Sequence, residues 1–388
     1  MAYFDYAATS PMPTAVIDAW TRAVHQRGNA SATHRDGQKS RLLWEEGRDK
    51  FAAALGANPF DLTLTGSGTE AINLSIKGLF WGRNGTPAER EPGASLPRPR
   101  ILTTEAEHHA ALDAVHWLVE AEGATVDFVR VDETGTVDLD DLAVKLGDDV
   151  ALFTTLWTNN EVGTIQPVAE IVALADAAGV PVHLDAVATL GYTPIDFATS
   201  GLAALSVSAH KVGGPVGVGA LAVSRAWPII PLIHGGSQQR LRSGSLDAAG
   251  VYAAGLAAEL ATANVATKSA RLSALRDRLA NGINATIPTA TLRGHATKRS
   301  PGNVHVTVTG LNSASALFLL DEAGHSVSAG SACQAGVQAP SHVLRAMGVA
   351  DNEGPLRFTL GLENSEGEID ALLRTLPDIV TRTSSISS

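Results

Sequence analysis

The sequence SVSAHKVGGPVGVG, residues 206–219, decides how the whole chain is interpreted. A run of small residues leads to His210 and Lys211, and four glycines follow within the seven positions 213–219. Small residues and glycines allow the backbone to approach a bound ligand closely. A lysine held there loses solvent, and desolvation lowers the pKa of an amine and makes it a nucleophile toward a carbonyl carbon. Taken alone, these residues also fit a solvated lysine beside a glycine-rich turn.

Composition restricts the class of protein. The chain has 388 residues, enough for two or three domains or for one large and one small domain. Its 45% hydrophobic and 18% charged content is that of a globular protein with a sizeable core. A formal net charge of −11 argues against direct nucleic-acid binding. The single cysteine, Cys333, cannot form an internal disulfide. We find no signal-peptide pattern at the start of the sequence and no 18-residue apolar run, so we expect a cytoplasmic protein without membrane contact.

Strand and helix patterns alternate through residues 14–262. Strands are predicted near residues 62–65, 100–104, 125–131, 150–156, 181–185, 203–207 and 218–223. Helices are predicted near residues 14–26, 38–55, 70–80, 109–121, 139–146 and 167–178, with an exposed loop over 82–99. This alternation predicts an α/β domain whose mostly parallel sheet is covered by helices on both faces.

The pattern changes after residue 262. Helices are predicted near residues 266–286, 313–323, 341–347 and 366–376. Val304, Val306 and Val308 alternate with polar residues, which predicts a strand with one solvated face. We therefore predict a large domain, 14–262, and a smaller α+β domain formed by residues 1–13 and 263–388.

Several polar groups follow the predicted strands, where open α/β sheets bind their ligands. Residues 66–69 (GSGT) join a strand to a helix and fit either a phosphate site or a tight turn. Asp185 fits either a ligand carboxylate or a cap of the next segment. Asn160 fits a turn, and His108 fits a structural histidine at a helix start.

Three common site chemistries do not match the sequence. A metal site is not expected, because the usual cysteine and histidine spacings are missing. A serine hydrolase would need a Gly-x-Ser-x-Gly elbow, which the turn at 66–69 does not provide. The same turn lacks the spacing of a nicotinamide-binding motif. Pyridoxal phosphate instead requires an amine, an anionic partner for its ring nitrogen and a phosphate site, and Lys211, Asp185 and the 66–69 turn supply all three.

A set of short motifs extends this interpretation over nearly the whole chain. They are FDYAAT (4–9), GNAS (28–31), TEAINL (69–74), EHHA (107–110), NNEVG (159–163), DA (185–186), SAHK (208–211), RSGS (242–245), SAGSAC (328–333) and RFTLG (357–361). Together they resemble the cysteine desulfurase family of class V aminotransferase-fold enzymes. The resemblance implies the fold of type I pyridoxal-phosphate transferases, with a mostly parallel seven-stranded sheet between helices and a smaller α+β domain that carries the catalytic cysteine loop.

The resemblance also implies roles for individual residues. Lys211 would bind the cofactor aldehyde covalently and later move protons, Asp185 would pair with the ring nitrogen, and His108 would stack on the ring. Phosphate ligands would be Gly68, Thr69, Ser208 and His210, joined by Ser245 from the neighbouring subunit of a homodimer. Asn160 would lie near the cofactor's phenolic oxygen and the substrate carboxylate, and Asn29 and Arg357 would bind that carboxylate.

Cys333 determines the implied reaction. A lone cysteine is usually a small buried hydrophobe, but here it lies in a stretch of small residues, where a thiolate can be exposed. The resemblance implies that L-cysteine becomes L-alanine while Cys333 takes the sulfur as a persulfide. It further implies transfer to an acceptor protein, such as an iron–sulfur scaffold or a tRNA-thiolation protein.

Three features depart from the family pattern. Ala188 stands where the family usually has a glutamine that hydrogen-bonds the cofactor, Leu362 stands where many relatives have arginine, and residues 236–242 are one residue shorter than usual. Two alternatives stay open: a selenocysteine lyase or other β-lyase of the same fold, and a sulfur-pathway partner protein that has lost turnover, for which Ala188 is the main support.

Overall fold

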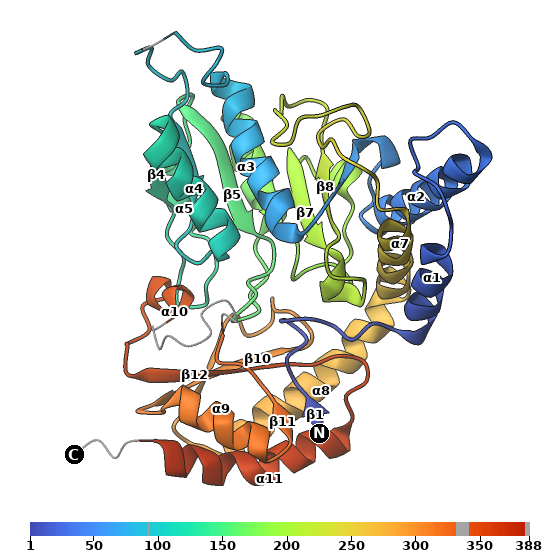
Figure 1. Ribbon diagram of the computed structural model, residues 1–388. Helices are drawn as coiled ribbons and strands as arrows, with labels where there is room; N and C mark the ends of the chain where they lie inside the picture. Colours follow the sequence, from blue (N-terminus) through green and yellow to red (C-terminus); the bar gives the residue numbers. More distant parts are fainter. Residues whose placement is uncertain (92, 331–340, 385–388) are drawn as a thin grey trace.

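The computed structural model describes residues 1–91, 93–330 and 341–384. A seven-stranded sheet with flanking helices forms the larger part of the molecule, and a three-stranded sheet with two long helices forms the part below it in Figure 1. Cys333 lies outside the described residues.

The large sheet has the spatial order β2-β8-β7-β6-β5-β3-β4. Its strands are β2 (Leu62–Thr65), β3 (Arg100–Thr103), β4 (Thr125–Phe128), β5 (Val150–Leu156), β6 (Val182–Asp185), β7 (Ala204–Ser208) and β8 (Gly219–Val223). All neighbours are parallel except β8, which runs antiparallel to β2 and β7. Every residue of β5, β6 and β7 is buried, as expected for a sheet covered on both faces. The predicted mostly parallel α/β fold is therefore confirmed.

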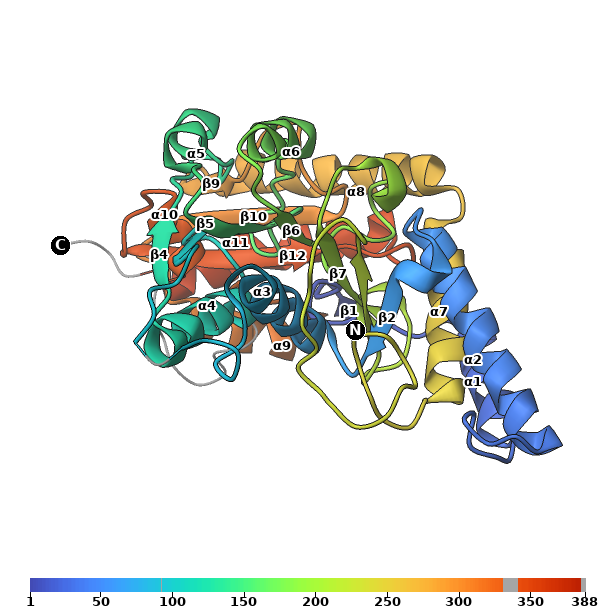
Figure 2. The ribbon, with the colours of Figure 1, turned by 90° about the horizontal axis from the view of Figure 1, so that it is seen from above.

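Helices cover both faces of this sheet. They are α2 (Arg35–Ala54), α3 (Gly68–Asn84), α4 (His109–Glu122), α5 (Leu139–Lys145), α6 (Val168–Ala177) and α7 (Ala248–Thr262). Helix α1 (Thr14–Val24) packs on α7 instead. Figure 2 shows α3 and α4 on one face and α5 and α6 on the other. Two separate apolar clusters hold these layers together, one around α3 and α4 and one that includes α2, α5, α6 and α7.

Helix α7 has no counterpart in the sequence prediction. Its sequence, AAGVYAAGLAAELAT, is small and apolar nearly all round, so it lacks the periodic polar face that identifies a surface helix. The small residues instead allow close packing on α2: a β-carbon at Gly255 would lie 2.2 Å from the carbonyl oxygen of Gly47. Only glycine fits at this helix contact.

The smaller sheet has the antiparallel order β12-β10-β9. Its strands are β9 (Ala290–Arg293), β10 (Asn303–Thr309) and β12 (Glu353–Thr359), and its helices are α8 (Val265–Thr286), α9 (Ser313–Glu322) and α11 (Glu366–Thr383). The N-terminal strand β1 (Ala2–Tyr3) pairs with β11 (His325–Ser326), and Ala2 and Phe4 join the apolar cluster of this part. The exact division at 262 stays a prediction.

The prediction that β10 has one solvated face is wrong. His305 and Thr307, on the supposedly wet face, are both fully buried. That face is turned toward the large sheet: Asn303 Nδ2 donates to the carbonyl oxygen of Glu161, and Arg357, opposite His305 in the register, donates to the carbonyl oxygen of Asn160. Asn303, His305 and Thr307 are therefore buried rather than surface residues, and only Thr309 at the end of β10 is exposed.

Candidate active site

A cavity of about 460 Å³ opens at the carboxyl ends of the parallel strands. Leu156, Asp185 and Ser208, which end β5, β6 and β7, all line it. Its other walls come from the start of α3, from residues 6–8 near the N-terminus and from β12. The two sheets and the N-terminal segment therefore enclose the cavity together.

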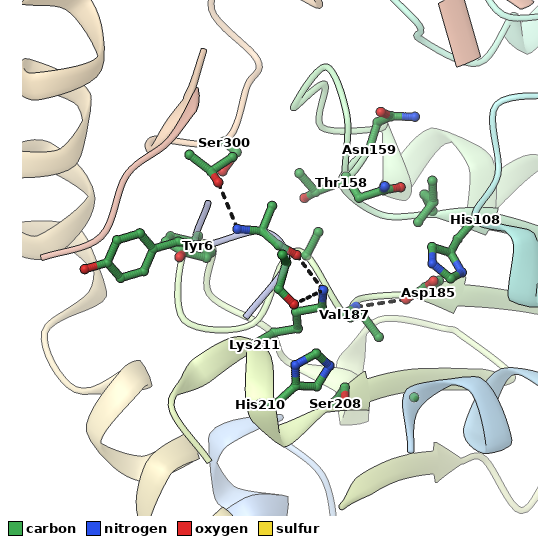
Figure 3. A pocket seen from close by; sticks show the side chains of 18 of the residues that line it. Tyr6, His108, Thr158, Asn159, Asp185, Val187, Ser208, His210, Lys211 and Ser300 are labelled. Atoms are coloured by element: carbon green, nitrogen blue, oxygen red, sulfur yellow. Dashed lines mark hydrogen bonds between the residues drawn. The ribbon is translucent and has the colours of Figure 1, made fainter. Parts of the chain in front are cut away.

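Lys211 lies in this cavity, on a 3₁₀ turn, Ala209–Val212, that follows β7 directly. Its Nζ donates to the carbonyl oxygen of Ala8 at 2.9 Å and to that of Ala7. The sequence analysis assigned residues 1–13 only to the small domain, yet Tyr6, Ala7 and Ala8 of this segment line the cavity. Figure 3 shows Lys211 between Tyr6 on one side and Asp185 with His108 on the other.

Asp185 presents a buried carboxyl group to the cavity. It is only 3% exposed, and one oxygen accepts the N–H of Val187 at 2.9 Å (Figure 3). Burial raises the pKa of Asp185 to about 6, although the Val187 N–H and Lys211 both favour its charged form. A buried carboxylate is stabilised by a nearby positive charge, so this group favours a cationic ligand in the cavity.

His108 caps the start of α4 and lines the same cavity. Its Nδ1 accepts the N–H of Ala110 at 3.0 Å, which leaves the proton of a neutral ring on Nε2. Burial, assisted by Lys211, lowers the pKa of His108 to about 4. The ring is therefore neutral at physiological pH and suited to lie against a flat ligand.

The start of α3 forms a cradle with the end of β7. Gly68 and Thr69 are the first residues of the helix, where backbone N–H groups lack partners within the helix and attract anions. A β-carbon at Gly68 would lie 3.1 Å from Cβ of Ser208, so glycine permits this close approach. Ser208 and His210 line the cavity beside them, as predicted from the sequence.

Glu70 is a structural residue of this cradle that the sequence interpretation did not identify. Its carboxyl group accepts the N–H of Gly66 at 2.7 Å and the Nε–H of Arg242 at 3.1 Å. One side chain thus closes the 66–69 turn and ties it to the 242–245 stretch. The signal was present as a glutamate within the first helical turn, but its partner lies 172 residues away.

Arg357 and Asn160 line the cavity together and are joined by a hydrogen bond. Arg357 is 2% exposed; its Nη1 donates to the carbonyl oxygen of Asn160 at 3.0 Å and its Nη2 to Asp5 Oδ1 at 2.9 Å. Asn160 Oδ1 is buried without a hydrogen-bond partner among the described residues. A planar guanidinium and an amide in this position suit a ligand carboxylate.

Asn29 and Ser245 do not line the cavity of their own chain. Both are exposed, and Asn29, in the loop between α1 and α2, accepts the N–H of Ser31 at 2.8 Å instead. The assignment of Asn29 to the substrate carboxylate therefore stays a prediction. Ser245 was assigned to the site of a neighbouring subunit, and this assignment stays a prediction.

Glu107 is a second titratable residue that the sequence interpretation left without a role. It is fully buried, and its Oε1 accepts the hydroxyl groups of Thr104 and Thr155, both at 2.7 Å. Burial raises the pKa of Glu107 to about 8, and the nearby Asp185 adds to this rise. A protonated Glu107 leaves Asp185 as the negative charge on this side of the cavity.

The amine, the buried carboxyl group and the anion cradle at the strand ends define this protein as an α/β enzyme. The chain belongs to the aminotransferase class-V family, whose sequence profile matches residues 2–372. A relative from Mycobacterium tuberculosis (strain ATCC 25618 / H37Rv), named "IscS-like cysteine desulfurase", is 46% identical over 388 residues and covers 98% of this chain and 97% of the relative.

Two solved structures support the same placement. One, described as "NIFS-LIKE PROTEIN", superposes with a TM-score of 0.88 and 31% identity, covering 98% of this chain and 99% of the other. Another, described as "SspA in complex with cysteine", has a TM-score of 0.78 and 29% identity, with 93% and 99% of the two chains covered.

Proposed function

We propose that this protein is a pyridoxal-phosphate-dependent cysteine desulfurase, which converts L-cysteine to L-alanine and retains the sulfur as a persulfide on Cys333. The observation that carries the proposal is the shared cavity of Lys211 and Asp185 with an anion cradle at the start of α3. The names of the relatives, which are cysteine desulfurases, point to the same activity.

The residues of the cavity fit pyridoxal 5′-phosphate. Gly68, Thr69, Ser208 and His210 would hold the phosphate, as would Ser245 from a second copy of the chain. Asp185 would face the ring nitrogen, whose positive charge satisfies this buried carboxyl group, and the neutral His108 would lie against the ring. When bound, the cofactor supplies a ring that accepts electrons from the substrate's α carbon.

The chain's own residues would then divide the work. Arg357 and Asn160 bind the carboxylate of L-cysteine and so fix its α carbon in the cavity. Lys211 removes and returns the proton at that carbon. The thiolate of Cys333 attacks the substrate sulfur, so that a sulfur–sulfur bond forms as the carbon–sulfur bond breaks, and protons complete L-alanine.

Partners and location follow from the same proposal. We expect a homodimer, because Ser245, which is exposed in its own chain, resembles a residue that reaches the phosphate in the neighbouring subunit. We also expect a sulfur-accepting partner, either an iron–sulfur scaffold or a tRNA-thiolation protein. We place the enzyme in the cytoplasm, since its single cysteine needs a reducing compartment to keep a free thiol. Within the described part of the chain, no helix has the length and apolar character needed to cross a membrane.

The proposal is tested by measuring L-alanine release from L-cysteine and from L-selenocysteine, with the wild-type enzyme and with Cys333→Ala. A desulfurase releases alanine from L-cysteine and loses sulfur transfer in the variant. A selenocysteine lyase would favour the selenium substrate and keep its activity without Cys333. Purified protein that stays colourless with added pyridoxal phosphate would indicate a partner protein without turnover.

Replacing Asp5 with alanine should weaken binding of L-cysteine through Arg357. Asp5 accepts a hydrogen bond from Arg357 Nη2, so its loss frees the guanidinium to move away from the substrate carboxylate. We expect KM for L-cysteine to rise about tenfold while kcat changes little, as a hydrogen bond to a charged group is lost. Steady-state kinetics check this, and an unchanged KM would show that Asp5 does not orient Arg357.

Replacing Ala188 with glutamine should restore the cofactor hydrogen bond that the family usually has. Ala188 lines the cavity beside Val187 and Asp185, so a longer amide side chain there can extend toward a bound ring. We expect the absorption band of the bound cofactor to shift relative to wild type. An identical spectrum with full cofactor occupancy would count against this placement of Ala188.

A further inference from the structure

Glu161 lies in the turn after β5, where its backbone is fixed from both sides. Its N–H donates to Asn159 Oδ1 at 2.9 Å, and its carbonyl oxygen accepts Asn303 Nδ2 at 2.9 Å. Two residues further on, Gly163 has a φ of +81°. A β-carbon at Gly163 would lie 2.8 Å from the Asn303 side chain, so the turn packs closely against Asn303. The backbone of Glu161 is therefore held between the two sheets.

The carboxyl group of Glu161 contacts Gly330 and Ser341, the described residues on either side of residues 331–340. Ser341 Oγ donates to Glu161 Oε2 at 2.6 Å. On the other side, a β-carbon built at Gly330 would lie 3.0 Å from the same oxygen, so the Gly330 backbone packs against the carboxyl group. Glu161 itself is 1% exposed, and its Oε1 has no hydrogen-bond partner among the described residues.

The chain that follows Ser341 is also fixed on the large domain. Helix α10 (His342–Ala346) begins with Ser341 as its cap, and His342 Nε2 lies 2.8 Å from the carbonyl oxygen of Glu107. The His342 ring packs on that of His109, with centroids 4.7 Å apart. Apolar side chains complete this contact as a small cluster: Ala106, Val162, Val343, Leu344 and Met347.

The contacts of Glu161 and α10 lie next to residues of the active site. Asn160, whose carbonyl oxygen accepts a hydrogen bond from Arg357 in the cavity wall, directly precedes Glu161. Glu107 and His109, which contact His342, directly flank His108. The two turns that present His108 and Asn160 to the cavity thus also hold the chain on either side of the stretch that contains Cys333.

We infer that Glu161 is a positioning residue for the sulfur-transfer step, acting through its contacts with Gly330 and Ser341. This inference rests on the proposed function, in which Cys333 takes the sulfur of L-cysteine. Among the described residues, the carboxyl group of Glu161 makes no hydrogen bond to Arg357 or to the Asn160 side chain. Its loss should therefore leave substrate binding intact. It should impair only the step that needs the flanking chain in place.

The test compares Glu161→Ala, Glu161→Gln and Ser341→Ala in the enzyme loaded with pyridoxal phosphate. Substrate binding is followed by the change in cofactor absorbance on adding L-cysteine, and sulfur transfer by the single-turnover rate at which Cys333 gains sulfur. We expect Glu161→Ala to slow sulfur transfer about tenfold or more and to change substrate affinity less than about twofold. Glu161→Gln keeps an oxygen that accepts from Ser341 and should recover most of the rate.

A double variant and a control sharpen the test. Ser341→Ala should slow the same step, because it removes the hydroxyl that donates to Glu161. Adding it to Glu161→Ala should contribute only the loss of the Ser341 cap of α10, since the shared hydrogen bond is already gone. Glu170→Ala, which removes an exposed glutamate on α6, is the matched control and should behave as wild type. Equal losses of cofactor, substrate affinity and sulfur transfer in Glu161→Ala would mean a purely structural role and overturn the inference. So would an unchanged sulfur-transfer rate.

Failure of the underlying function is a separate result. If the wild-type enzyme gives no sulfur on Cys333, the proposed function fails whatever the variants do. If wild type transfers sulfur and Glu161→Ala does so equally fast, only the role of Glu161 is contradicted.

Discussion

Replacing Lys211 with alanine is expected to lower the rate of alanine release by about 10³-fold or more, since the residue that moves the substrate proton is removed. Pyridoxal phosphate should then bind without a covalent link, so borohydride reduction should label the wild-type enzyme and leave the variant unlabelled. The amine is held near the cavity by the carbonyl oxygens of Ala7 and Ala8, and no change of fold is expected on its removal.

Controls for this variant are direct. Lys298→Ala removes an exposed lysine and should keep full activity and full labelling. Circular dichroism of Lys211→Ala should match wild type. Activity within about tenfold of wild type in the Lys211 variant would mean that another group moves the proton.

Replacing Asp185 with asparagine is expected to lower kcat on the order of 10²-fold, because a preorganised charge is removed from the place where the ring nitrogen would lie. The effect should depend on pH. Burial raises the pKa of Asp185 to about 6, so below that pH the carboxyl group is protonated and cannot pair with a cation. Wild-type affinity for the cofactor should therefore fall as the pH decreases through about 6, and the variant should lack this part of the dependence.

The measurement is cofactor affinity from pH 5 to 8, by absorbance titration, in both proteins. The phosphate group also loses charge near pH 6, with a second pKa of about 6, and it does so equally in both proteins. The difference between the two profiles therefore reports Asp185 alone. Asp176→Asn, at an exposed position on α6, is the control. Parallel profiles for wild type and Asp185→Asn would contradict the assigned role.

The fold could be predicted from the sequence because its strands are short apolar runs between helices of regular spacing. Lys211 and Asp185 could be located for the same reason, since Asp185 ends one buried strand and Lys211 follows another, and these strand ends meet at one edge of the sheet. Helix α7 could not be predicted, because its small apolar residues have no periodic face.

The rest of the site depends on contacts between residues far apart in the chain. Glu70 meets Arg242, Asp5 meets Arg357 and Glu161 meets Ser341 across 172, 352 and 180 residues of sequence. Packing against the large sheet buries His305 and Thr307 of β10, whose alternation with valines predicts a solvated face in the sequence. Asn29 lies on an exposed loop of its own chain, and its assignment to the substrate stays a prediction.

The most direct test of the account is mass spectrometry of the enzyme after one equivalent of L-cysteine. The account predicts one added sulfur atom on the peptide that contains Cys333, formed together with an equal amount of L-alanine and removed by a thiol reductant. Release of alanine with free sulfide and an unmodified Cys333 peptide, when product is trapped within a single turnover, would contradict it.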